Sequence, residues 1–373
     1  MKKMGIIIGF IYKGIPVSLG IQKSVLIRSF IVFAVISAAV MIGIMLWTTE
    51  PKTWSHFRDF QLIHIPLILG LGTLRWILDG TIFTSLTSGG GGVRVGIGRA
   101  TVIRLEGNLI SIILPVFIGM LTMHAYLLHR EKMDWGESMA VSTLRAILPV
   151  LLFLLVIPVQ ALARLGLNSG SSFERFMGAI SVPVLAGAVI VVLALFFPDR
   201  IKKAASWILR GWKKLKAEQA GKIAAVEARL LREIDQFSRI FRMTVEEKPG
   251  RLFAAAGWVL LTFLADAMIA IAVLWGFGYH PPILKALAVQ FLIWPLIYLA
   301  PTPGSMGVME LSYMGFYSMF MPKPAIGLAI LIVRILTTYL PMVAGVWLLA
   351  REFRADGRLK EMVLEQRLSE TKT

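Results

Sequence analysis

The stretch Ala300-Pro301-Thr302-Pro303-Gly304-Ser305-Met306-Gly307-Val308-Met309-Glu310 lies between two apolar runs near the C-terminus. It cannot form a regular transmembrane helix, because prolines lack a backbone donor and fix φ, while glycines permit turns that side chains forbid. Non-helical backbone inside a bilayer is tolerated only where protein covers it or where it lines a cavity. We therefore expect this stretch to line a cavity, with a helix beginning near Gly304 to Gly307 whose free N–H groups face that cavity.

The composition of the whole chain is that of a membrane protein. Of its 373 residues, 57% are hydrophobic and 16% are charged, and the mean hydropathy is +0.74. These values and several apolar runs of about twenty residues indicate a polytopic membrane protein. The net charge of +17 comes from cations in loops beside the apolar runs, which membrane orientation requires, so no nucleic-acid partner is expected. The absence of cysteine excludes disulfides, thiol catalysis and thiolate metal sites.

The apolar runs and the basic loops predict a topology. The N-terminus and the segment Pro198 to Arg251 are rich in lysine and arginine, which places both in the cytoplasm, and the C-terminus is expected there too. With both segments on one side, one of the five runs between them cannot cross. The best candidate is Leu109 to Leu128, which polar and helix-breaking residues interrupt; a kinked full span is the alternative. The interruptions are Asn108, Ser111, Pro115 and Gly119.

The same layout recurs in the second half, where Ala286 to Phe320 forms a second broken pair. The predicted fold is therefore an all-α polytopic membrane protein with six full spans and two broken or re-entrant helical hairpins, arranged as inverted repeats over residues 25–163 and 176–350. The expected full spans are 29–47, 61–83, 139–163, 176–197, 252–277 and 325–350. Each hairpin is followed by a helix that carries an arginine, Arg145 in the first half and Arg334 in the second.

Two further segments are expected to be cytoplasmic. Residues 199–250 show apolar side chains at helical spacing with lysines and arginines between them, which predicts amphipathic helices that lie on the inner leaflet or dock on a partner. Residues 351–373 have mixed charge and form a tail.

Ionisable residues within apolar spans need a partner or a cavity. Arg75 and Asp79 are four residues apart and can pair with each other. Asp266 has no local partner, so we expect it to meet Arg145 or Arg334. Both arginines are also candidates to bind a lipid phosphate, because guanidinium groups match phosphate oxygens bidentately. The alternative is that each arginine extends to the nearer membrane interface.

Glu310 has two readings, which the sequence leaves open. It can face a cationic or hydroxyl-bearing headgroup or take up a proton during transport. It can instead be a helix-start carboxylate that completes the turn after Gly307.

Other motifs give little support for a phosphate loop, a metal site or a catalytic nucleophile. Glycines at 89–92, 96 and 98 with Arg94 and Arg99 suggest a phosphate loop, but no Gly-Lys-Ser/Thr follows, so a flexible cytoplasmic connector is the better interpretation. The histidines lack metal-ligand spacing and Gly304 to Gly307 misses the Gly-x-Ser-x-Gly elbow. We expect no cofactor and no metal, and an enzyme is disfavoured without being excluded.

The string Pro301-Thr302-Pro303-Gly304-x-x-Gly307-x-x-Glu310, with Arg334 and Thr337 to Pro341 after it, resembles the flippase-like transmembrane region of lysylphosphatidylglycerol synthases and its stand-alone relatives. Asn108 to Gly119 followed by Arg145 is similar to the first half of that family. The resemblance implies a bacterial inner-membrane protein that moves or handles a polar lipid. The synthases also carry a soluble aminoacyl-transferase domain, which is absent from this sequence, so lipid aminoacylation is not expected. The chain departs from the family at Ser305, where a second glycine is usual, and at Met120.

The sequence thus predicts a lipid flippase or transporter-like protein for an anionic or aminoacylated phospholipid or a lipid-linked headgroup. The alternatives are a membrane glycosyltransferase or lipid-modifying enzyme, which lacks support because no Asp-x-Asp pair occurs, and a noncatalytic scaffold. The expected partners are the membrane and its lipid substrate, and a homo-oligomer is left open. The predicted substrate-binding residues are Asn108, Arg145, Asp266, Pro303, Gly304, Gly307, Glu310, Arg334 and Tyr339.

Overall fold

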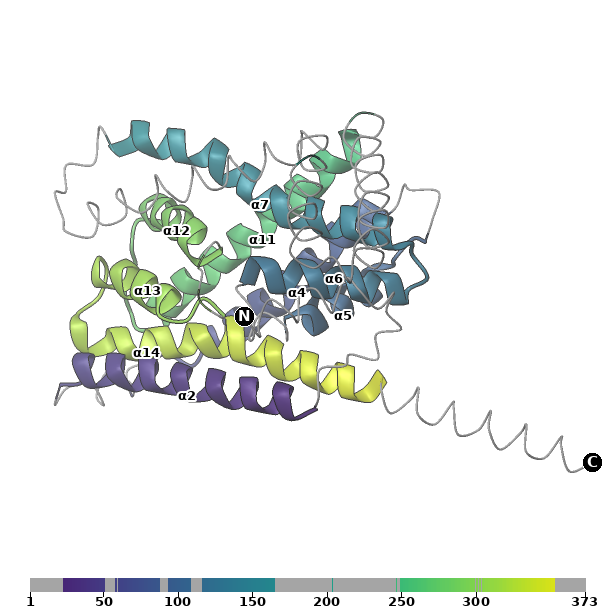
Figure 1. Cartoon of the computed structure of the whole chain (residues 1–373). Coiled ribbons are helices and arrows are strands. Elements are labelled where there is room, and N and C mark those ends of the chain that lie inside the picture. Colours follow the sequence, from purple (N-terminus) through teal and green to yellow (C-terminus); the bar gives the residue numbers. More distant parts are fainter. Residues whose placement is uncertain are drawn as a thin grey trace, which may run out of the picture.

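A computed structural model describes residues 23–50, 58, 60–87, 93–108, 116–164, 203, 246, 249–298, 300, 302 and 304–352. All regular elements within these ranges are helices, as expected. They are α2 (Lys23–Thr48), α4 (His64–Thr87), α5 (Ile97–Gly107), α6 (Val116–Arg130), α7 (Trp135–Arg164), α11 (Pro249–Gly276), α12 (Ile283–Tyr298), α13 (Val308–Ser318), α14 (Lys323–Arg334) and the π-helical turn η4 (Ile335–Tyr339) (Figure 1). The expected span 176–197, most of the segment 199–250, most of the tail and Pro303 lie outside the described residues.

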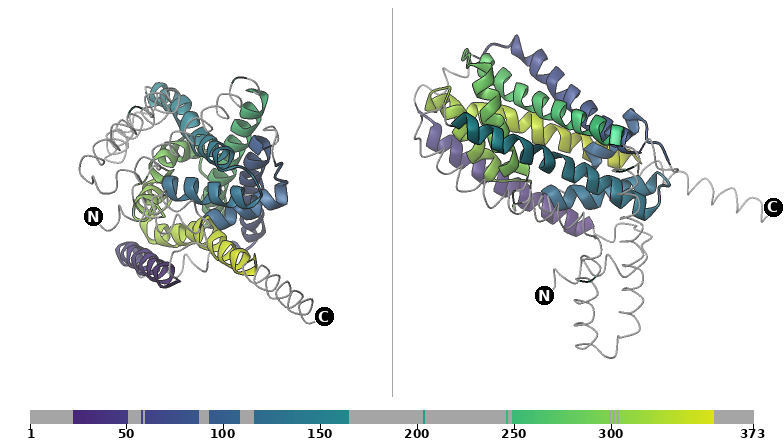
Figure 2. Two further views of the ribbon diagram at one scale, coloured as in Figure 1. Left: turned by 45° about the vertical axis from the view of Figure 1, so that its right-hand side comes forward. Right: turned by 90° about the horizontal axis from the view of Figure 1, so that it is seen from above.

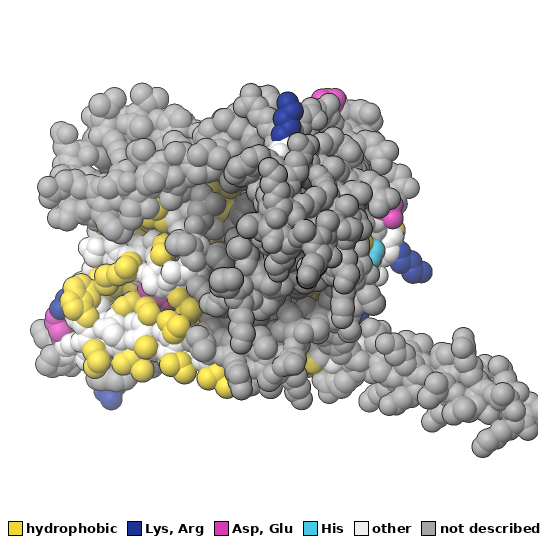
Figure 3. Space-filling view, in the orientation of Figure 1, with side chains coloured by type: hydrophobic (Ala, Val, Ile, Leu, Met, Phe, Trp, Pro, Cys, Tyr) yellow, Lys and Arg dark blue, Asp and Glu magenta, His cyan; other side chains and the backbone are white. Residues whose placement is uncertain are grey.

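Four of the described helices are long and apolar enough to cross a membrane. They cover His64–Thr87, Trp135–Phe153, Pro249–Gly276 and Lys323–Glu352, the last being α14 continued through η4. Their apolar side chains face both the protein interior and the exterior. Figure 3 shows hydrophobic side chains gathered on the exterior at the lower left, where α13, α14 and α2 lie in Figure 1. Such a surface is stable in contact with lipid and not in water.

A long helix, two short helices and a further long helix follow one another twice along the chain. The first set is α4, α5, α6 and α7, and the second is α11, α12, α13 and α14. In each set the two short helices contact each other. At 1.5 Å per residue, the 11 residues of α5 and of α13 reach only about 16 Å, roughly half of a bilayer core.

The structure corrects the expected position of the first hairpin. Its arms are α5 and α6, so the apolar run 109–128 contributes one arm instead of both. Residues 97–99, interpreted above as part of a flexible connector, are the first turn of α5. Hydropathy missed this helix because it carries charged side chains that are buried against protein, among them Arg104 and Glu106.

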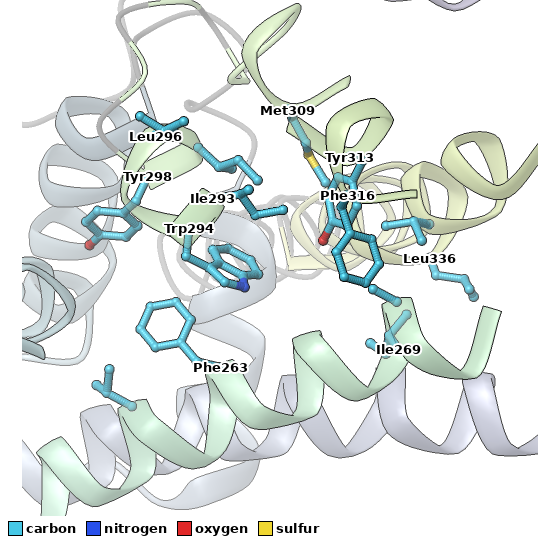
Figure 4. Close-up of a cluster of buried hydrophobic side chains, with 14 of the residues drawn as sticks. Phe263, Ile269, Ile293, Trp294, Leu296, Tyr298, Met309, Tyr313, Phe316 and Leu336 are labelled. Atoms are coloured by element: carbon cyan, nitrogen blue, oxygen red, sulfur yellow. The ribbon is translucent and has the colours of Figure 1, made fainter. Parts of the chain in front are cut away.

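Close helix contacts fix the centre of the molecule. The α4 and α11 helices share an extensive interface, and α2 lies along α14 (Figures 1 and 2). Between α11 and the second hairpin, aromatic side chains fill the space: Phe263 packs against Trp294 with ring centroids 5.1 Å apart, and Tyr313 and Phe316 face the part of α11 that carries Ile269 (Figure 4).

Two glycines let backbones approach. A Cβ at Gly80 would lie 2.4 Å from Thr101 Oγ1 and 2.8 Å from its backbone nitrogen, and a Cβ at Gly345 would lie 2.3 Å from the carbonyl oxygen of Leu105. Small residues serve this purpose in membrane helices generally. As a result, α5 lies wedged between α4 and the end of the last helix.

Candidate functional site

The broken stretch near the C-terminus forms a turn that leads into α13. Gly304 and Gly307 have φ of 58° and 80°, values that favour glycine. Ser305 adopts a φ of 54°, which is uncommon for a residue with a side chain, and its hydroxyl donates to the carbonyl oxygen of Ile297, 2.6 Å away. That bond ties the turn to the end of α12.

Glu310 closes the turn and pairs with the next helix. Its Oε2 accepts the N–H of Gly307 at 2.8 Å, and its Oε1 accepts from Arg334 Nε at 2.7 Å. Both side chains are fully buried. The helix-start reading of Glu310 is therefore confirmed as a contact, and both of its oxygens have partners.

Arg334 stands at the junction between α14 and the π-helical turn. Its Nη1 donates to Thr338 Oγ1 at 3.2 Å, and the N–H of Leu340 bonds to the carbonyl of Ile335, which widens the helix by one residue. Pro341, which has no N–H, follows directly. Widened turns of this kind often occur at functional sites.

A second ionic group joins three helices of the first half. Asp79 on α4 accepts from Arg104 on α5 through Oδ2 and from Arg145 on α7 through Oδ1. The three side chains are between 1% and 7% exposed. The Phe83 ring lies 5.9 Å from the Arg145 guanidinium carbon, a cation–π distance that positions the arginine further.

The structure overturns two predicted pairings. Arg75 forms an ion pair with Asp266 across the interface of α4 and α11, instead of pairing with Asp79 four residues along. Asp266 therefore meets an arginine from another helix, as expected, but neither Arg145 nor Arg334. The extensive interface between α4 and α11 explains both differences, because it places Arg75 of α4 directly against Asp266 of α11.

These groups surround a cavity of about 140 Å³. The turns of both hairpins reach it, the first through Asn108 and the second through Gly304 and Ser305. The remaining lining residues come from the four long helices and from the short helices α5, α12 and α13. The lining comprises Arg75, Asp79, Ile82, Arg104, Asn108, Arg145, Pro149, Val259, Thr262, Phe263, Asp266, Trp294, Ile297, Tyr298, Gly304, Ser305, Met309, Thr337, Thr338 and Met342.

The cavity brings together some of the predicted site residues and leaves others outside. Asn108, Arg145, Asp266 and Gly304 line it. The remaining described ones do not: Gly307, Glu310 and Arg334 form the ion-paired turn behind the wall, and Tyr339 bonds through its hydroxyl to Ser37 on α2, 2.6 Å away.

Sequence reasoning did not name several lining residues as binding residues. Arg104 escaped because α5 is too polar to be recognised as a membrane-embedded helix, although its position four residues before Asn108 was a usable signal. Thr337 and Thr338 lie in the Thr-Thr-Tyr-Leu-Pro string, whose proline signals an irregular helix. Trp294 gave no signal that separates it from an ordinary core residue. Within the described ranges no group of three or more histidine, aspartate or glutamate side chains could hold a metal ion.

Most of the chain is similar to known membrane proteins. A model described as the lysylphosphatidylglycerol synthase TM region matches residues 29–345. A UPF0104 membrane protein of Archaeoglobus fulgidus is 22% identical over 304 residues, which are 81% of this chain and 90% of that protein. No solved structure matches.

Proposed function

The chain belongs to the family of lysylphosphatidylglycerol synthase transmembrane regions, and from that premise we propose that it moves a lipid with an anionic headgroup across the membrane. It is a multi-pass membrane protein of a lipid-related family. The observation that carries the proposal is the cavity that Asn108 of the first hairpin and Gly304 and Ser305 of the second both line, with Arg75, Arg104 and Arg145 in its wall.

The site suits a polar headgroup with its acyl chains outside. About 140 Å³ is less than the roughly 300–1,000 Å³ of sites that enclose drug-sized ligands. Arginines match phosphate oxygens geometrically, and burial strengthens that contact. Discontinuous helices that meet at a shared site are also how many transporters bind substrate.

The finer topology belongs to the same proposal. We place the protein in a bacterial inner membrane with both termini in the cytoplasm, and we treat 25–163 and 176–350 as inverted repeats of six full spans and two re-entrant hairpins. The repeated order of long and short helices supports this arrangement. The cytoplasmic insertion 199–250 and the tail 351–373 complete the predicted organisation.

Reconstitution in liposomes tests the transport proposal. Fluorescent phosphatidylglycerol is placed in both leaflets, and a membrane-impermeant quencher then reports the fraction that reaches the outer leaflet. The protein should raise that fraction, and Arg145→Gln should slow the movement about tenfold or more because a phosphate contact is lost. The matched control is Arg130→Gln, which removes a partly exposed arginine outside the cavity. Equal rates with and without protein would overturn the proposal, and a new lipid product on addition of a sugar nucleotide would favour the glycosyltransferase.

A further inference from the structure

Among the residues that the structure describes, the charged side chains that line the cavity do not balance. Three arginines and two aspartates line it, and the described ranges add no other ionisable side chain to the lining apart from Tyr298. The flanking segments 109–115 and 299–303 contain no ionisable residue in the sequence. The pairs Arg75–Asp266 and Arg334–Glu310 are each neutral.

The excess charge is localised. Asp79 uses one oxygen for Arg104 and the other for Arg145, so a single negative charge serves two guanidinium groups. The group therefore keeps one formal positive charge at the place where α4, α5 and α7 meet. Glu106, the next carboxylate on α5, does not line the cavity.

Two of the residues that line the cavity have buried donors without a partner in the part of the chain that the structure describes. Arg145 Nε and Trp294 Nε1 are buried and have no hydrogen-bond partner among the described residues, and the two side chains are 5% and 7% exposed. A buried charge and buried donors without partners are costly, so a native structure normally satisfies them. A ligand with one negative charge would neutralise the excess positive charge, and its oxygens could accept hydrogen bonds from donors that lack a partner.

We propose that the cavity selects a headgroup with one net negative charge, namely a lipid phosphodiester without a compensating cation, with Asp79 as the residue that sets this preference. This inference rests on the proposed function and narrows its substrate class. A phosphomonoester carries about −1.5 to −2 charges at pH 7, more than the single excess charge. A zwitterionic headgroup would bring a cation close to the group formed by Arg104 and Arg145, where like charges repel.

Binding to the full chain in detergent tests the inference independently of transport. Short-chain phosphatidylglycerol, phosphatidic acid and phosphatidylcholine serve as monoanionic, more highly charged and zwitterionic probes, and thermal stabilisation gives their relative affinities. Phosphatidylglycerol should bind most tightly. Its deacylated headgroup, glycerophosphoglycerol, separates the sources: weaker binding than the lipid points to the membrane, and equal binding supports the charge preference while pointing to a soluble phosphodiester.

Two variants change the charge without removing an arginine. Asn108→Asp places a second carboxylate beside Arg104, and Thr262→Asp adds one from α11 on another wall. Either should lower the ratio of phosphatidylglycerol to phosphatidylcholine affinity by about tenfold or more, because the added carboxylate cancels the one excess positive charge near the ligand. The matched controls Asn108→Ser and Thr262→Ser keep the charge and should keep the ratio.

The outcomes are distinguishable from failure of the proposed function. Equal affinity of the wild-type protein for all three lipids, or an unchanged ratio in a folded aspartate variant, would overturn the charge inference even if lipids are transported. A preference for phosphatidylglycerol that either aspartate variant removes would support it, even if the liposome assay shows no lipid movement and the transport proposal fails.

Discussion

Glu310 and Arg334, which are 24 residues apart in the sequence, form a fully buried ion pair with 2.7 Å between Oε1 and Nε. Because the other oxygen of Glu310 caps the Gly307 turn, the pair joins the second hairpin to the last long helix. The shape of the cavity wall therefore depends on a contact that lies behind it.

Glu310→Gln should be strongly destabilising. Glutamine has one acceptor oxygen and can still accept the N–H of Gly307, but Arg334 would then keep only Thr338 and would be a buried charge without a carboxylate, which typically costs roughly 3–5 kcal/mol. The double variant Glu310→Gln/Arg334→Gln should recover part of that loss. Unfolding measurements on the wild-type protein, the two single variants and the double variant supply the cycle; additive effects would show that the pair does not couple.

Gly345→Ala should lower stability and the yield of folded protein, because its Cβ would lie 2.3 Å from the Leu105 carbonyl oxygen, a backbone atom that cannot move aside cheaply. Gly257→Ala on α11 is the matched control, since a Cβ there meets nothing within 4 Å. Alanine in a helix is favoured over glycine by up to about 1 kcal/mol, so the control should be neutral or stabilising. Similar losses in both variants would contradict the close approach of α5 and the last helix.

Substitutions of Ser305 test the left-handed backbone conformation of the turn. Ser305→Ala removes the hydrogen bond to Ile297 and keeps the unfavourable positive φ, whereas Ser305→Gly removes the same bond but relieves the backbone strain. We expect glycine to be more stable than alanine by about 1 kcal/mol. Thermal melts of the two variants measure the difference, and a more stable alanine variant would contradict the left-handed turn.

The ion pairs of Glu352 are partly exposed, in contrast to the buried pair of Glu310 and Arg334. Glu352 bridges Arg99 on α5 and Arg130 at the end of α6, with the side chains about a quarter exposed. Exposed ion pairs contribute under about 1 kcal/mol and are screened by salt. Glu352→Gln should therefore have a small effect that disappears between low and high salt, while the loss in Glu310→Gln should persist. A large effect that salt does not change would mean that this end is more tightly closed than its exposure indicates.

Some of this architecture could be predicted from the sequence. The broken stretch 300–310 was recognisable because proline and glycine have fixed backbone consequences, and α11 and the last long helix followed from hydropathy alone. The helix α5 could not be recognised in the same way, because it is rich in charge and the sequence does not show that its Arg104 is buried in an ion pair with Asp79 of α4.

The partners in the buried ion pairs could not be predicted from the sequence either. Sequence reasoning identified Asp266 as a residue that needs a cation from another helix, yet it selected the wrong arginine. Which guanidinium reaches which carboxylate depends on helix packing, and that packing depends on close approaches such as the one between Gly80 and Thr101. Spacing along one helix predicted an Arg75–Asp79 pair that the interface with α11 replaces.

Whether a lipid headgroup occupies the cavity can be seen in a density map of the protein in lipid nanodiscs that contain phosphatidylglycerol. We expect headgroup density between Asn108 and Gly304, in contact with Arg145 and with the acyl chains leading outward. A map in which lipid is confined to the outer surface, with side chains or water alone filling the space between Asn108 and Gly304, would contradict this expectation.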